Sequence, residues 1–214
     1  MKQKITSTLL GALLMLGMLS CEKDDLISDI KGDQSPIGEV GNEIEFGTIS
    51  GISSPQISVS SLENGISTFS CSASVTNSSY IDLLELVPNA LIPGTVSVSE
   101  NQVQADINIK VTDEGGQLVF NDGTKLTLIN YDAKVGDKYT ATVGNTKLEN
   151  EVIEKSTEDD FLWGGMYIKV IKVKAKSTVP GISDVILIYN HKFGLVGADI
   201  HFEDGTTKYI SVFC

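Results

Sequence analysis

The sequence predicts an all-β fold, and three observations support this prediction. Apolar and polar residues alternate over ten residues from Ile66 to Val75, the period of a strand with one buried face. The preceding apolar segment, residues 57–62, is separated from it by Glu63-Asn64-Gly65, and Asn-Gly favours a hairpin turn because both residues accept positive φ. The same order of short strand, turn and strand recurs as far as residue 213. We therefore expect antiparallel hairpins that form a strongly curved sheet, a half-barrel or a sandwich.

The remaining hairpins follow the same rule, with Asn, Asp or Gly between their strands. They are expected at residues 95–99 with 103–111, 117–120 with 125–131, 139–143 with 147–153, and 199–202 with 208–213.

Two further segments need separate interpretation. Over residues 166–176 the apolar residues change phase, with Ile168 and Val170 on one face and Ile171 and Val173 on the other. A one-residue slip in a long strand is what a β-bulge produces, so a bulge is expected here. The only segment that suits a helix is residues 80–86, which precede Pro88 and could form one or two helical turns or a strand.

Composition excludes several functions. The chain has 214 residues, 16 basic and 28 acidic side chains, and a formal net charge of −12. All basic residues are lysines, so the planar fork with which arginine binds phosphates and base edges is missing, and nucleic-acid binding is not expected. Two histidines and three cysteines leave little material for a metal site, and we expect no metal and no cofactor.

The N-terminus has the layout of a secretory signal peptide. A basic start, Met1–Lys4, precedes an apolar run from Leu9 to Leu19 that is shorter than the roughly 20 residues of a membrane-spanning helix. Met18-Leu19-Ser20-Cys21 then resembles the lipobox of bacterial lipoproteins. The resemblance implies cleavage before Cys21 and acylation of that cysteine, while the alternative is an ordinary signal peptide followed by a chance cysteine.

The tetrapeptide after this cysteine carries a second resemblance. Glu22, Lys23, Asp24 and Asp25 resemble the surface-export signal of Bacteroidota lipoproteins. This implies a lipid-anchored protein of the outer membrane, displayed outward, against the alternative of a periplasm-facing position. The membrane would then be a partner through the anchor, since each buried methylene of an acyl chain contributes about 0.8 kcal/mol.

Three regions follow from these observations. Residues 1–20 are expected to be the signal peptide, and residues 21–46 the acylated cysteine with a flexible tether, because they show no sustained period and many breakers. Residues 47–214 are expected to form the all-β domain, with a division into two subdomains near residue 130 left open.

The second half of the chain resembles a type of β-rich bacterial lipoprotein. Asn130 to Tyr139 contains an aromatic residue, a short spacer and Val-Gly-Asp before a strand, and Phe193 to Gly197 follows an extended strand at residues 185–189. The resemblance implies a curved antiparallel sheet similar to that of lipoprotein-carrier half-barrels, and it implies no catalytic residues.

The chain contains two cysteines in addition to Cys21, the proposed lipidation site. Cys71 shares a strand face with Phe69 and Ala73, and Cys214 shares one with Ile210 and Val212, so both are expected to point to the apolar side. A disulfide between them would stabilise an exported protein by roughly 4–5 kcal/mol in the chain-entropy model. Two free, buried cysteines are the alternative.

The histidines also permit two interpretations. His191 and His201 lie on either side of residues 193–197 and would approach one another if that segment formed a hairpin loop. A metal site would need further ligands at suitable spacing, so ordinary surface histidines are the default expectation.

The sequence predicts a role without catalysis. No Gly-x-Ser-x-Gly motif and no glycine-rich phosphate loop is present. We expect a non-catalytic binding or structural role at the cell envelope, with a protein, a glycan or an apolar ligand as the unknown partner. One alternative is a carrier of an apolar ligand or lipid inside the curved sheet, and another is a hydrolase of glycans or envelope components. A carrier requires an apolar concavity that its inward side chains do not fill.

Overall fold

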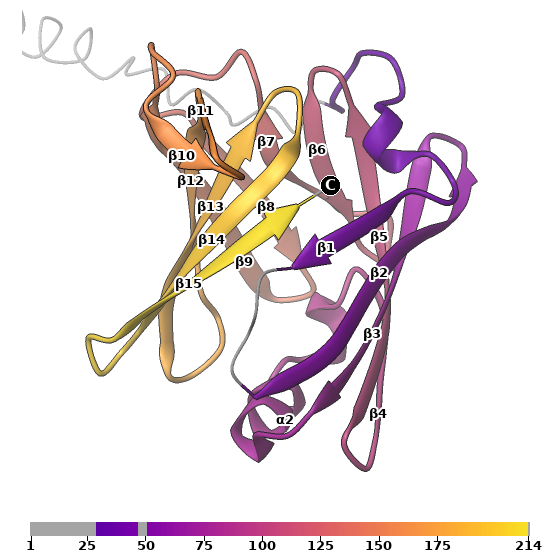
Figure 1. Ribbon diagram of the computed structural model, residues 1–214. Coiled ribbons are helices and arrows are strands. Elements are labelled where there is room, and N and C mark those ends of the chain that lie inside the picture. The colour runs from indigo at the N-terminus through magenta and orange to yellow at the C-terminus, as the bar shows by residue number, and fades with distance from the viewer. Residues whose placement is uncertain (1–28, 47–50, 214) are drawn as a thin grey trace, which may run out of the picture.

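The structure, a computed structural model, describes residues 29–46 and 51–213 and confirms the all-β prediction (Figure 1). All pairings between neighbouring strands are antiparallel in these ranges. The strands are β1 (Glu43–Phe46), β2 (Ile52–Glu63), β3 (Ile66–Val75), β4 (Gly94–Ser99), β5 (Gln102–Thr112), β6 (Gly115–Val119), β7 (Lys125–Asn130), β8 (Lys138–Val143), β9 (Thr146–Lys155), β10 (Phe161–Trp163), β11 (Met166–Ile168), β12 (Ile171–Lys176), β13 (Ile182–Asn190), β14 (Gly194–Phe202) and β15 (Thr207–Phe213).

Helical structure is limited to three short segments within the described ranges. The helix expected at residues 80–86 is present as α2 (Ser78–Glu85). Two 3-10 turns, η1 (Pro36–Gly38) and η2 (Asn89–Leu91), complete the set.

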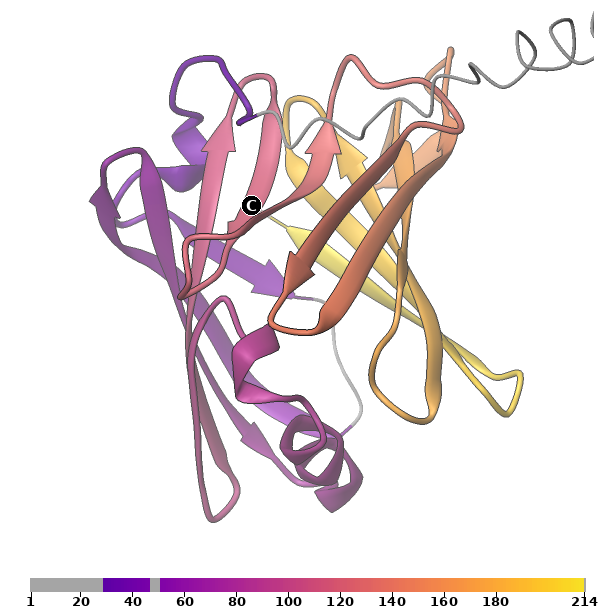
Figure 2. The same cartoon turned by 180° about the vertical axis from the view of Figure 1, so that it is seen from behind.

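Thirteen of the described strands form one sheet. Twelve of them follow the order β7-β6-β5-β3-β2-β1-β15-β14-β13-β12-β9-β8, and β4 pairs with β5 beside this path. β1 pairs with β15, so an early strand and the last strand lie side by side in the middle of the sheet (Figure 1). The sheet is strongly curved and nearly closes into a barrel (Figure 2).

The two ends of this sheet, β7 and β8, approach each other at a seam that side chains connect. Asn150 on β9 donates a hydrogen bond from Nδ2 to the backbone oxygen of Thr127, at 2.8 Å. Lys155 Nζ donates to the backbone oxygens of Tyr131 and Ala133, both at 2.9 Å. The expected division near residue 130 falls at this seam, while the pairing of β1 with β15 joins both sides into one sheet.

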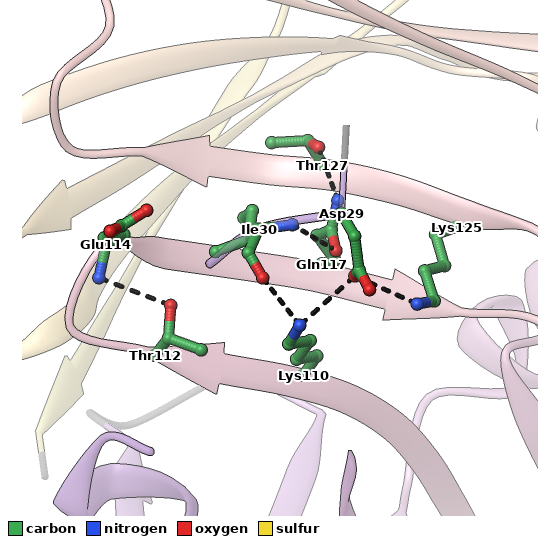
Figure 3. A network of polar contacts seen from close by, with 8 residues as sticks. All are labelled: Asp29, Ile30, Lys110, Thr112, Glu114, Gln117, Lys125 and Thr127. Atoms are coloured by element: carbon green, nitrogen blue, oxygen red, sulfur yellow. Dashed lines mark hydrogen bonds and ion pairs between the residues drawn. The ribbon is translucent and has the colours of Figure 1, made fainter. Parts of the chain in front are cut away.

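Part of the predicted tether is folded onto the sheet. Residues 29–38 are here called the strap. Its first residues, Asp29 and Ile30, lie on the outer face of β5, β6 and β7 (Figure 3). Its later part reaches the interior, where Ile37 packs against an apolar cluster. Asp29 places one carboxylate oxygen 3.2 Å from Lys110 Nζ and 2.9 Å from Lys125 Nζ. Ile30 is buried, and its backbone nitrogen donates to Gln117 Oε1 at 3.1 Å.

The strap ends by covering one end of the sheet. Gln34 forms an isolated antiparallel β-bridge with Thr112. In η1, Ile37 packs against the buried cluster of Val59, Phe69 and Val111. β1 follows and pairs on both sides. The flexible tether predicted for residues 21–46 is therefore wrong from residue 29 onward, because these residues gain their order from contacts with distant strands and not from a local period. Residues 21–28, with Cys21 and the Glu22–Asp25 signal, lie outside the described residues.

The apolar phase change at residues 166–176 has a different cause from the one predicted. The segment is two strands, β11 and β12, separated at Lys169 and Val170. The β10–β11 hairpin lies on the outer face of the sheet, where Trp163, Ile168 and Val170 form a buried cluster with Ile188 and Val196. A register shift does occur nearby, between Lys172 and Val173 against β9.

Candidate ligand site in the apolar interior

Alternation along β2, β3 and β5 produces one apolar and one polar face. Ile57 pairs with Cys71, and Cys71 pairs with Ala105, so these side chains share the inner face of the curved sheet. The next residues along each strand pair in the same way on the outer face, where Ser70 Oγ donates to Asp106 Oδ1 at 2.6 Å. The polar groove of about 320 Å³ on this outer face is lined mainly by serine, threonine and glutamine.

The inner face encloses a first apolar cavity near the strap, the strap-end cavity, of about 250 Å³. Side chains from both halves of the sheet line it, including Phe69, Ile109, Ile129 and Leu195. Ile37 of the strap closes this end, and a Cβ on Gly194 would lie 2.8 Å from its Cδ1. Glycine suits position 194, because φ there is +67° and a larger side chain would force Ile37 to move.

A second apolar cavity, the helix-end cavity, lies at the other end of the sheet and measures about 320 Å³. In Figure 1, α2 marks this end of the sheet at the bottom of the view, and the strap, in indigo, lies at the top. The side chains that line the helix-end cavity are half-buried, except that of Val75, which is buried. The lining residues are Ile52, Ala73, Val75, Leu84, Val87, Val103, Val179, Ile182, Ile200, Phe202, Lys208 and Ile210.

A smaller cavity of about 180 Å³, the connecting cavity, lies between these two and shares wall residues with each. It shares Phe46, Ile57 and Cys71 with the strap-end cavity. It also shares Ile52, Ala73 and Val103 with the helix-end cavity. The three cavities thus form a run along β2, β3 and β5, in which neighbouring cavities share wall residues.

Cys71 lines both the strap-end cavity and the smaller, connecting cavity. Burial raises the pKa of its thiol to about 11, and the carboxylate of Asp106 adds to the shift. The thiol is therefore protonated at neutral pH and behaves as a small apolar group. The structure contains Cys71 as a free cysteine, whereas Cys214 lies outside the described residues, so their disulfide stays a prediction.

The interior contains few polar groups. Tyr131 and Tyr189 line the strap-end cavity, and burial raises the pKa of Tyr189 well above its ordinary value. Lys208 lines the helix-end cavity and is the one charged side chain among the described walls of the three apolar cavities. Sequence reasoning missed Lys208, although it is in phase with Ile210 and Val212 and so was visible as an inward lysine.

The two histidines are not brought together. His191 is exposed in the turn between β13 and β14, whereas His201 pairs with Asp184 at the far end of the same hairpin. His201 Nδ1 lies 2.7 Å from Asp184 Oδ1, and Lys174 Nζ lies 3.1 Å from the other oxygen. Across residues 29–46 and 51–213, no group of three or more potential ligands is placed to hold a metal ion.

Aromatic side chains give little support for a glycan platform. Trp163 is 7% exposed, packs between Phe193 and Phe213, and donates from Nε1 to the backbone oxygen of Val212 at 2.8 Å. Tyr167 on the same hairpin is 64% exposed. The only tryptophan of the chain is therefore used in packing.

No helix in the described part of the chain is long and apolar enough to cross a membrane. No family model matches the chain, and no curated protein or solved structure matches it significantly.

Proposed function

We propose that this protein binds an apolar ligand in the interior of its curved sheet and does so as a lipid-anchored protein of the bacterial envelope. The observation that supports ligand binding is the run of apolar cavities from the strap to α2. The helix-end cavity alone reaches the lower limit of ligand sites, which span roughly 300–1,000 Å³ and are mostly apolar with few polar groups.

Incomplete packing at the helix end favours this proposal over a purely structural role. Ile182, Ile200 and Ile210 face inward yet remain half-buried. Apolar surface left accessible in this way lacks the contacts that stabilise a closed core. A ligand chain would supply them, at about 0.8 kcal/mol for each methylene removed from water.

Catalysis has less support in the same space. A hydrolase needs a nucleophile or paired carboxylates in a cleft. The described walls of the three apolar cavities contain no carboxylate, and their one thiol, Cys71, has a raised pKa.

Native mass spectrometry of the lipidated protein from its own membrane tests ligand binding. We expect a co-purifying apolar molecule in addition to the covalent acyl chains. In the variant Ala73→Leu, a leucine would occupy space shared by the connecting and helix-end cavities, so less ligand should co-purify while the fold is retained. Gln104→Leu adds the same side chain on the outer face and should leave the ligand in place. A ligand-free wild-type protein, or equal ligand in both variants, would contradict the proposal.

The anchor is tested separately from the ligand. The N-terminal peptide of the mature protein should begin at Cys21 and carry acyl chains, and Cys21→Ser should release the protein from the membrane fraction. Replacement of Lys23, Asp24 and Asp25 by alanine should remove it from the reach of protease added to intact cells. An unmodified Cys21 would contradict the lipoprotein assignment and leave the ligand proposal standing.

A further inference from the structure

We infer that the ligand is an anionic, single-chain amphiphile whose head group binds Lys208 while its tail occupies the apolar cavities. The inference rests on the proposed function and specifies its ligand class. The observation that carries it is a lysine on the inner face of an otherwise apolar wall.

Register places Lys208 on that face. Lys208 pairs with Ile200, and Ile210 pairs with Ala198, so Lys208 and Ile210 are inward while Thr207 and Tyr209 are exposed. Both inward residues line the helix-end cavity with Ile200. A strand that only needed packing would carry another branched apolar residue here, since a charge near apolar walls costs free energy unless it is solvated or paired.

The position of Lys208 suits a head group. It follows the β14–β15 turn and precedes the part of β15 that pairs with β1, which begins at Val212. Its alkyl stem can lie along apolar neighbours while the ammonium remains near water. Lys208 already interacts with another group of the protein, and the anionic head group of a ligand would bind in addition to that contact.

Charge gives the lysine its selectivity. With a formal net charge of −12, the protein as a whole repels anions, so a binding site for an anion needs a local cation. A carboxylate at Lys208 would form a charge-assisted hydrogen bond, which is roughly twice as strong as a neutral one. The apolar tail would then extend past Ala73 and Val103, which the helix-end and connecting cavities share.

Calorimetric titration with dodecanoate and with dodecanol tests this inference. The chain from Glu22 onward is used, because it contains every described residue. At mildly alkaline pH dodecanoate should bind about tenfold more tightly than dodecanol, equivalent to about 1.4 kcal/mol. Lys208→Met should remove this preference with little effect on dodecanol, and Lys208→Arg should retain it. Lys176→Met replaces an exposed lysine near the same end of the sheet and should change neither affinity.

The outcomes separate the two proposals. If neither compound binds to the wild-type chain, the proposed ligand-binding function fails. Equal affinities for both compounds, or a preference that survives in Lys208→Met, overturn the role of Lys208 alone. The wild-type comparison decides the matter even if Lys208→Met does not fold.

Discussion

Cys71 shows how position in the sheet limits the chemistry of a side chain. Its strand, β3, is separated from β15 by β2 and β1. Neighbouring strands lie about 4.8 Å apart, so about 14 Å of sheet separates β3 from Phe213, which pairs with Glu45. A disulfide joins Cα atoms less than about 7 Å apart. Because Cys214 directly follows Phe213 in the chain, we expect Cys71 to remain a thiol.

That expectation is tested by reactivity. Since its pKa is raised to about 11, Cys71 should react slowly with DTNB near pH 8 in the native state and rapidly after unfolding. The variant Cys214→Ser, prepared from Glu22 onward, leaves Cys71 as its only thiol. A wild-type mass that increases by two hydrogen atoms on reduction would instead demonstrate the disulfide.

Asp29 gives the strap a pH-dependent contact. Hydrogen bonding by Lys125 is the largest cause that lowers the pKa of this carboxyl from 3.8, and partial burial opposes it. A lowered pKa in the folded state stabilises the protein above about pH 4, and this contribution is lost as the pH falls through the lowered value.

Asp29→Asn should therefore lower the free energy of unfolding by less than about 1 kcal/mol at neutral pH, because the carboxylate is largely exposed. The difference from wild type should shrink as the pH falls below about 4. Urea unfolding at several pH values measures it. Asp33→Asn, in the same strap but without an ion pair among the described residues, is the matched control. An Asp29 effect that grows in acid would contradict the assignment.

At the scale of elements, the β10–β11 hairpin shows how a very short unit is held in place. Each strand has three residues, too few for independent stability. The hairpin is ordered because Trp163 is inserted between Phe193 and Phe213 and bonds to the backbone of β15. Its outward residues, Leu162 and Tyr167, contribute little to this packing.

Trp163→Phe should cost about 2 kcal/mol of unfolding free energy, because the Val212 oxygen loses its donor and a smaller ring leaves a gap. Leu162→Ser, at a side chain that is 61% exposed, should change stability by less than about 0.5 kcal/mol. Denaturant unfolding monitored by circular dichroism compares the two variants. Similar losses would show that Trp163 does not hold the hairpin.

The long strands were predictable from sequence, and the short ones were not. β3 and β5 alternate over ten residues or more, which reveals both strand and inward face. β1 has four residues and the strap has no period, so neither can be recognised without the distant strands that pair with them. The phase change after Ile168 was visible, but its cause, a hairpin covering the outer face, depends on packing.

At the scale of the whole molecule, the seam between β7 and β8 is where the strand-to-strand ladder of the main sheet is interrupted among the described residues. Lys155 and Asn150 connect its sides through side chains, whereas the opposite side is a continuous ladder. We expect local opening to occur preferentially at the seam.

Lys155→Met should speed amide exchange in residues 125–143 by removing two bonds to backbone oxygens of the β7–β8 connection. Hydrogen exchange of β2 and β15, in the middle of the strand order and far from both ends of the sheet, should not change. Lys147→Met, an exposed lysine of the same strand, serves as the control. Uniformly faster exchange would indicate global destabilisation instead of an opening at the seam.

The candidate site was only partly predictable. Alternation identifies Ile57, Ala73 and Ile210 as inward. Whether the facing strands fill the space between these side chains depends on the curvature of the sheet, which cannot be inferred from a short stretch of sequence.

The strap also shortens the expected tether. If Cys21 carries the anchor as proposed, at most about 30 Å of extended chain separates it from Asp29, so the folded domain stays close to the membrane surface.

The pairing of β1 with β15 also affects the order of folding. Phe46 meets Val212 across a separation of more than half the chain, and contacts this distant in sequence form slowly because a large loop must close first. Until β15 arrives, the inward residues of β2 and β3 lack the facing strands that shield them. If the protein is exported as proposed, a chain emerging on the far side of the membrane would expose this apolar, incomplete sheet until β15 had been translocated. Closure of the interior is thus expected to be a late and rate-limiting event in the formation of this protein.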